Sequence, residues 1–77
     1  DGMMPDAIAG IELTAAIPAL ERAEKYLAAL AYDLHEQCLR AECEGHWDEL
    51  KRIDEAADQT RRRLEAVRNV LRSARDL

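Results

Sequence analysis

Residues 46–77, HWDELKRIDEAADQTRRRLEAVRNVLRSARDL, contain the clearest repeating pattern of apolar residues in the chain. Apolar or small side chains recur there at alternating spacings of three and four residues, and no Pro or Gly interrupts them. This spacing is typical of one stripe of an amphipathic helix with a heptad-like repeat. It predicts a helix over about residues 46–75. The residues of the stripe are Leu50, Ile53, Ala57, Thr60, Leu64, Val67, Leu71 and Ala74.

A second segment of this kind precedes the first at residues 18–44, PALERAEKYLAALAYDLHEQCLRAECE. Pro18 suits the first turn of a helix, where its missing N–H needs no partner. Gly45 is the residue type found most often just past a helix C-terminus. Two long helices with so short a join must fold back on each other. We therefore expect an all-α fold, an antiparallel two-helix hairpin over 18–77 with coiled-coil-like packing. The stripe of its first helix is Leu20, Ala23, Leu27, Leu30, Leu34 and Ala41, interrupted by Gln37.

Residues 1–17 precede the hairpin as an N-terminal arm. One interpretation is a short third helix that opens at Pro5 and uses Ile8, Ile11 and Leu13 as its apolar residues. The other is an ordered but irregular arm. The Met, Ile and Ala content of the segment favours packing against the hairpin in either case.

The middle of the first predicted helix is apolar nearly all the way round. In YLAALAYDL, residues 26–34, only Asp33 is charged. A helix that is hydrophobic on every side is expected to pack against neighbours on more than one side, and the second helix can cover only one of these sides. We therefore expect a groove that binds the apolar face of another helix. The candidate residues for this groove are Tyr26, Leu27, Leu30, Tyr32, Leu34, Trp47 and Val70.

Charge and composition narrow the class of protein. The net charge of −5 disfavours general binding to nucleic acid or other polyanions. No apolar run approaches the ~20 residues that cross a bilayer, so we expect no membrane partner. The acidic start, DGMMPDAIAG, does not read as a signal peptide. Two Cys are too few for a disulfide scaffold, and a cytoplasmic location follows as the default expectation.

Two His and two Cys cluster around the predicted turn, in the pattern His35-x2-Cys38-x4-Cys43-x2-His46. A zinc ion accepts such a ligand set in tetrahedral geometry. On one continuous helix, however, the two His would lie about 16 Å apart along the axis, too far for one metal ion. We expect packing and helix-end roles for these residues, with no metal and no cofactor. No Ser or Thr stands with His and Asp at helical spacing, so we expect no enzyme activity.

Six Arg fall between residues 61 and 75, all on the second predicted helix. No stacking aromatic accompanies them, as single-stranded nucleic acid would require. Salt bridges explain them better, because Arg61, Arg63 and Arg68 flank the stripe that meets the antiparallel first helix. Glu24 with Arg68 is the interhelical pair that we expect first. Pairs at i,i+4 are also expected, namely Glu36–Arg40, Asp48–Arg52 and Asp58–Arg62.

The stretch EGHWDELKRIDEAADQTRRRLEA, preceded by YLAALAYDLHEQCLRA, resembles the central helical hairpin of FliT-type flagellar export chaperones. In that family a Trp-Asp-Glu-Leu-like segment opens the second helix, and it is matched here by residues 47–50. The similarity spans about residues 26–66. In length and plan the chain is also similar to the small two-helix co-chaperones of type III secretion. Both resemblances imply a small acidic hairpin that shields the amphipathic helix of an export substrate.

Two functional hypotheses therefore stand together. In the first, the chain is a chaperone or adaptor that binds a partner's helix in a secretion or export system. In the second, the same surface forms a homodimer, a four-helix bundle made from two hairpins, or the chain is a regulatory domain without chaperone activity.

Overall fold

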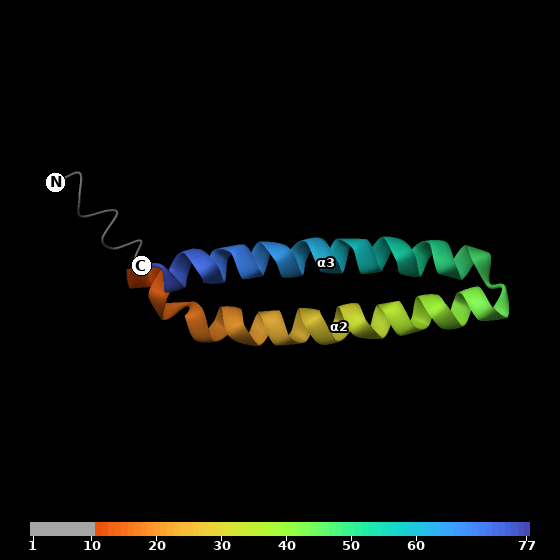
Figure 1. The fold of residues 1–77 in the computed structure, drawn as a ribbon, viewed down its shortest axis with the longest axis horizontal. Coiled ribbons are helices and arrows are strands. Elements are labelled where there is room, and N and C mark those ends of the chain that lie inside the picture. The colour runs from red at the N-terminus through yellow and green to blue at the C-terminus, as the bar shows by residue number, and fades with distance from the viewer. Residues whose placement is uncertain (1–10) are drawn as a thin grey trace.

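The computed structural model describes residues 11–77, and it is an antiparallel pair of long helices (Figure 1). Helix α2 spans Ile17–Glu44 and helix α3 spans Trp47–Arg75. The described residues contain no strand. The predicted all-α hairpin is confirmed, and its predicted bounds of 18–44 and 46–75 differ from the observed ones by a single residue at each start.

A short helical stretch, residues 11–15, precedes α2 and lies at the end of the hairpin next to the C-terminus (Figure 1). Ala16 forms a turn, and its N–H donates to the carbonyl oxygens of Glu12 at 3.1 Å and Leu13 at 3.2 Å. Leu20 then donates its N–H to the carbonyl of Ala16 at 3.0 Å, which starts the hydrogen bonding of α2. Of the two interpretations of the N-terminal arm, the short helix is confirmed. Its predicted start at Pro5 and its apolar Ile8 lie outside the described residues.

The turn between the helices depends on Gly45, which has a left-handed φ of 73°. Its N–H donates to the carbonyl of Glu42 at 3.2 Å, and the N–H of His46 donates to that of Ala41 at 2.9 Å. These two bonds form a Schellman motif, which satisfies carbonyls that the end of α2 leaves unpaired. Gly supports this geometry without the steric cost that a Cβ brings. The reversal is therefore fixed by one residue type at one position.

The two helices meet along a narrow seam made of small residues and leucines. Thr60 is the buried polar residue of this seam, and its hydroxyl donates to the carbonyl of Ala56 at 2.8 Å. The small side chains of the alanines let the two backbones approach closely. The predicted stripe of α3 is confirmed, because five of its residues are buried and the others are half-buried. The buried apolar residues are Ala41, Ala57, Leu64, Leu71 and Ala74.

The two sides of the seam are not buried equally. Only one residue of α2, Ala41, is buried, whereas α3 has five buried residues. The stripe leucines of α2, among them Leu27 and Leu34, are half-buried. Apolar residues of α2 occupy a wider arc than one neighbouring helix can cover. Much of the apolar surface of α2 therefore faces solvent in the single chain.

The conformation of Gly45 leads to a stability prediction. Gly45→Ala should lower the free energy of unfolding by about 1–2 kcal/mol, because a Cβ is strained in the left-handed region. The space around the position is open, so no clash adds to this cost. Gly45→Asn is the control and should lose less, since Asn tolerates this conformation. Urea unfolding followed by circular dichroism measures both, and an Ala variant as stable as the unaltered chain would contradict the described turn.

Candidate protein-binding surfaces

Two interhelical ion pairs mark one side of the seam. The Nε of Arg68 lies 3.1 Å from Oε2 of Glu24 and donates a hydrogen bond to it. The Nη2 of Arg75 lies 3.6 Å from Oε2 of Glu21. The expected pairing of Glu24 with Arg68 is confirmed. Because each pair joins residues at the same height of the hairpin, the two pairs also define which residues of α2 and α3 lie opposite each other.

The ion pairs expected within single helices form only in part. Arg62 and Asp58 meet at 3.0 Å, as predicted. At the turn, His46 lies 3.6 Å from Glu44 and 3.8 Å from Glu49, contacts that become ion pairs when the imidazole is protonated. The expected pairs that do not come within 4.0 Å among residues 11–77 are Glu36–Arg40 and Asp48–Arg52.

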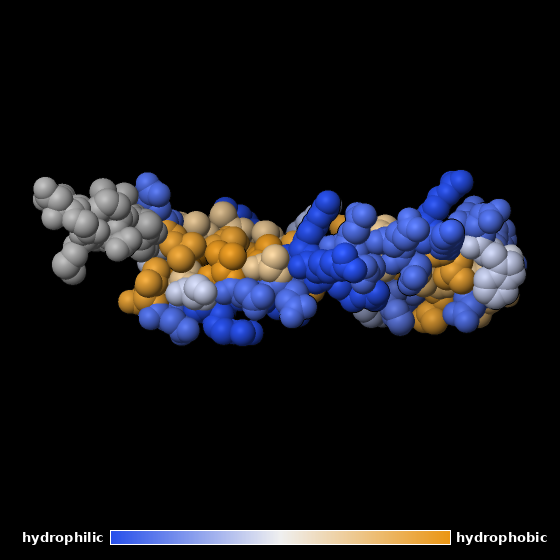
Figure 2. All heavy atoms as spheres, turned by 90° about the horizontal axis from the view of Figure 1, so that it is seen from above, coloured by the Kyte–Doolittle hydropathy of each residue, from blue (hydrophilic) through white to orange (hydrophobic). Residues whose placement is uncertain are grey.

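An uncovered apolar surface lies on the other side of the seam from these ion pairs. We call it the apolar face. Its α2 residues are spaced four, three and four apart, and its α3 residues three and four apart, so each set forms one helical stripe. In Figure 2, apolar side chains gather over the half of the hairpin that carries the C-terminus and again near the turn, while hydrophilic ones cover its middle. The residues of the apolar face are Ala19, Ala23, Tyr26, Leu30, Val67 and Val70, and the buried Ala74 continues the α3 stripe at its edge.

The centre of the apolar face consists of large, accessible side chains. Tyr26 is 68% exposed and Val70 is 41% exposed. Leu30 and Val67 beside them are half-buried, and Ala23 is half-buried between them. Such a surface, apolar and continuous across two helices, has the form of a docking face.

The structure does not bring all seven sequence-predicted binding residues to one surface. Tyr26, Leu30 and Val70 share the apolar face. Leu27 and Leu34 point into the seam and are half-buried. Tyr32 is as exposed as Tyr26 but lies about 120° from it around α2, because six residues separate the two. Trp47 is 64% exposed and lines a different surface, on the side of the ion pairs.

That second surface is a shallow groove between α2 and α3, which we call the arginine groove. Three hollows follow one another along it. The first two share Arg61, and the second and third share Arg68 and Arg72, so they form one continuous surface. Arg68 is paired with Glu24, as described above. Neither Arg61 nor Arg72 has a carboxylate of residues 11–77 within ion-pairing distance.

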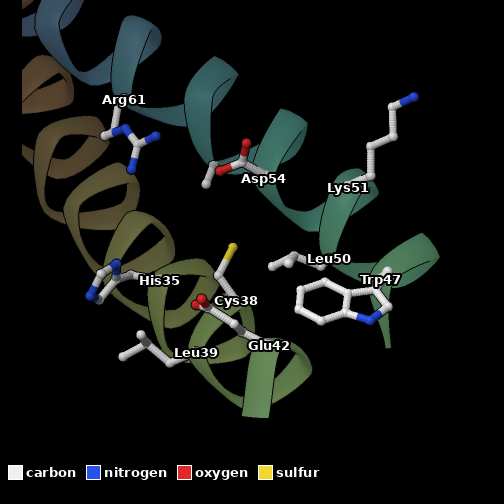
Figure 3. Close-up of a pocket in the computed structure, with 10 residues that line it drawn as sticks. His35, Cys38, Leu39, Glu42, Trp47, Leu50, Lys51, Asp54 and Arg61 are labelled. Atoms are coloured by element: carbon white, nitrogen blue, oxygen red, sulfur yellow. The ribbon is translucent and has the colours of Figure 1, made fainter. Parts of the chain in front are cut away.

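The hollow nearest the turn, the Trp47 hollow, has a volume of about 490 Å³. Figure 3 shows the Trp47 ring beside Leu50 on α3, with Cys38 and Leu39 across from them on α2 and the Lys51 side chain pointing away. The side chain of Arg61 extends from α3 toward α2 at the other end of the hollow. The full lining is His35, Cys38, Leu39, Glu42, Trp47, Leu50, Lys51, Asp54, Ala57 and Arg61.

The His and Cys residues around the turn are spread over different environments. His35 and Cys38 line the Trp47 hollow, Cys43 is exposed, and His46 contacts the acidic residues of the turn. Both Cys are free. Within residues 11–77, no three His, Cys, Asp or Glu side chains gather as a metal ion requires.

Sequence reasoning missed several residues of these surfaces. Ala19, Ala23 and Val67 belong to the apolar face, and the four-three-four spacing of apolar residues from 19 to 30 is the signal that finds it. Leu39 and Arg72 belong to the arginine groove. No single-helix pattern marks that groove, because it exists only where two helices lie together.

Comparisons with known proteins do not extend this picture. No protein-family model, no curated protein and no solved structure matches the chain. Among residues 11–77, no helix combines the length and the apolar character of a membrane span.

The Glu24–Arg68 pair leads to a second prediction. A double-mutant cycle with Glu24→Ala and Arg68→Ala should give a coupling free energy of about 0.5 kcal/mol that weakens as salt is added. The Glu24 side chain is only 31% exposed, whereas both partners of Asp58–Arg62 are at least half exposed. The Asp58–Arg62 cycle is therefore the matched control and should couple more weakly. Zero coupling for Glu24–Arg68 in urea unfolding would contradict the interhelical register.

Proposed function

We propose that this chain is a small helical interaction module, a chaperone or adaptor that binds an amphipathic helix of a partner protein along its apolar face. The observation that carries the proposal is the exposure of Tyr26 and Val70 next to half-buried Leu30 and Val67. A chain of this size buries only a modest fraction of its surface on folding, so apolar area that stays in water is a substantial loss of stability. Covering that area with a partner helix stabilises both chains.

The shape of the face supports a helix as its occupant. Apolar stripes from two antiparallel helices lie side by side, and a third helix can pack its own i, i+3, i+4, i+7 residues against such a surface. Removing apolar area from water is worth about 25 cal/mol for each Å². The alanines at positions 19 and 23 let a partner backbone approach closely, and Tyr26 supplies a large anchor beside them.

The resemblance of residues 26–66 to FliT-type chaperones and to type III secretion co-chaperones supports an export system as the setting. In that setting the partner helix belongs to an export substrate, and the hairpin keeps its apolar side covered before secretion. The proposal places the protein in the cytoplasm, where Cys38 and Cys43 stay reduced, in agreement with their free state here.

A homodimer through the same face is the second candidate function. It is favoured by the self-complementary plan of the face, because two hairpins stacked on their apolar faces make a four-helix bundle. Electrostatic repulsion disfavours this homodimer, because six of the eight charged residues in 61–77 are Arg. A symmetric dimer centred on the apolar face brings these two basic ends near each other. Sedimentation of the pure chain distinguishes the two candidate functions, because only the homodimer predicts a stable dimer in place of the monomeric hairpin.

The binding role of the apolar face is tested by placing a photo-crosslinking amino acid at position 26 or, as a control, at position 32 in the native host. These two tyrosines have equal exposure, 68%, but lie on different flanks of α2. We expect position 26 to attach to an amphipathic segment of another protein, and position 32 to attach far less.

The affinity for the segment identified in this way is then measured with purified chain. Tyr26→Glu should weaken it by about tenfold or more, since a buried charge without a partner is costly, and Tyr32→Glu should leave it nearly unchanged. Crosslinks from position 26 only to a second copy of this chain would establish the homodimer instead. Equal crosslinking of both positions to the same segment would contradict a defined binding face.

A further inference from the structure

The arginine groove contains two cations that the chain itself does not neutralise. Arg68 and Arg75 are held by Glu24 and Glu21, whereas Arg61 and Arg72 lie in the same row of hollows without an ion pair among residues 11–77. Eleven residues make about three turns of helix, so Arg61 and Arg72 lie on one face of α3. Guanidinium groups without an ion pair can form charge-assisted hydrogen bonds with carboxylates.

The turn end of the same groove is apolar and open. Trp47 is 64% exposed and Leu39 is 45% exposed at the Trp47 hollow, and half-buried Cys38 and Leu50 form its deeper part (Figure 3). A hollow of about 490 Å³ is larger than one side chain needs. It therefore accepts a large apolar side chain with part of the helix that carries it.

We propose that the arginine groove is a second protein-binding site, which takes an acidic amphipathic helix. One large apolar side chain of that helix enters the Trp47 hollow, and two of its carboxylates pair with Arg61 and Arg72. This site lies on the opposite side of the hairpin from the apolar face, so it does not depend on the function proposed for that face. A chain with both sites is an adaptor that joins two partners.

The positions of the two Arg fix the pattern of the partner. Arg61 and Arg72 are eleven residues apart on α3, which is about 16 Å along the helix axis. Carboxylates about eleven residues apart on a partner helix lie on one side of it at the same spacing, because eleven residues make about three turns. An apolar residue about seven positions before the first carboxylate reaches the Trp47 hollow on that same side.

Charge also fixes the direction of the partner helix. In the Trp47 hollow Glu42 and Asp54 balance Lys51 and Arg61, whereas the second hollow has three Arg against one Glu. The turn end of the groove is therefore the less positive end and suits the positive N-terminal end of a helix better. Arg68 and Arg72 lie toward the other end and favour the negative C-terminal end. The partner helix therefore runs parallel to α3 and antiparallel to α2.

The same acidic residues argue against nucleic acid as the ligand. A phosphate backbone carries a negative charge at every nucleotide and has to pass Glu42 and Asp54 in the first hollow and Glu65 in the second. A protein helix places its carboxylates only where Arg61 and Arg72 lie. The groove thus matches a ligand with spaced charges better than one with continuous charge.

The test uses Trp47 as a reporter, since it is the only Trp of the chain. The probe is a synthetic helical peptide of about 22 residues, with Leu at one position and Glu about seven and about eighteen positions later. A peptide with Lys in place of both Glu is its matched partner. We expect the Glu peptide to shift the Trp47 emission to shorter wavelength in a saturable way, and the Lys peptide to bind about tenfold more weakly or worse.

Variants of the full chain then locate the charges. The double substitution Arg61→Glu with Arg72→Glu should lower the affinity for the Glu peptide by about tenfold and should restore binding of the Lys peptide. Arg40→Glu with Arg52→Glu changes the net charge equally at exposed positions outside the three hollows of the groove, and it should leave both affinities nearly unchanged. Circular dichroism confirms that each variant is folded.

Three results would overturn the proposal. The first is no saturable emission shift with the Glu peptide, and the second is equal weakening by the control pair and the groove pair. The third is displacement of the Glu peptide by a single-stranded oligonucleotide that binds more tightly, which would make the groove a nucleic-acid site. None of these results bears on the apolar face, whose own test uses positions 26 and 32.

Discussion

The single seam between the two helices limits how much apolar surface this molecule can bury. Helix α3 offers one stripe, and that stripe is nearly covered, as Leu64 and Leu71 show by their burial. Helix α2 has apolar residues over a wider arc, and α3 reaches only the middle of it. The remainder of that arc stays in water as long as the hairpin is alone. The exposed apolar face is thus a consequence of packing one narrow stripe against one broad one.

The thin core follows from the same constraint. Three of the six buried residues among 11–77 are alanines, which bring the backbones close but remove little apolar area from water. A small domain with so little burial is expected to be marginally stable unless something else helps. In the function that we propose, a partner helix on the apolar face supplies that help, so binding and stability would be linked in this chain. Binding of such a partner would also raise the apparent stability, with the logarithm of the partner's concentration once that exceeds the Kd.

The distribution of charge separates the two sides of the hairpin by function. Arg68 and Arg75 join α2 to α3 and so belong to the scaffold. Arg61 and Arg72 have no such role among residues 11–77 and remain available to a ligand. The apolar face lies on the opposite side, and binding there would depend on shape complementarity and buried area instead of charge. Under the two proposals the surfaces would therefore select different partners, which is the property that an adaptor requires.

The fold could be predicted from the sequence almost completely, because it depends on local signals. The three-four spacing of Leu64 and Leu71 with their neighbours, together with Gly45, determines two helices and the reversal between them. The Glu24–Arg68 pair was also predictable, since equal distance from the turn makes the two residues neighbours. The division of Tyr26 and Tyr32 between different flanks was less accessible. An apolar run such as residues 26–34 shows that a helix is hydrophobic on all sides. Which of these sides stays exposed depends on where α3 packs against it.

The arginine groove was out of reach for a different reason. Its residues come from two helices, and no periodicity within either helix connects Leu39 with Trp47 or shows that Arg72 forms no ion pair among residues 11–77. Individual surface rotamers are equally hard to foresee, as Glu36 and Arg40 show by failing to meet at a favourable spacing. Exposed ion pairs have small free energies, so the side-chain entropy of either residue is enough to decide the outcome.

The claim that α3 leaves part of α2 uncovered is tested most directly by comparing Tyr26→Ala with Leu71→Ala in the pure, monomeric chain. Leu71 is 1% exposed and Tyr26 is 68% exposed. Urea unfolding should show that Leu71→Ala costs about 2–5 kcal/mol, enough to unfold much of the protein, while Tyr26→Ala changes the free energy of unfolding by less than about 0.5 kcal/mol. A Tyr26→Ala variant destabilised as much as Leu71→Ala would mean that Tyr26 is already buried in the isolated hairpin, and the account of an open binding face would be wrong.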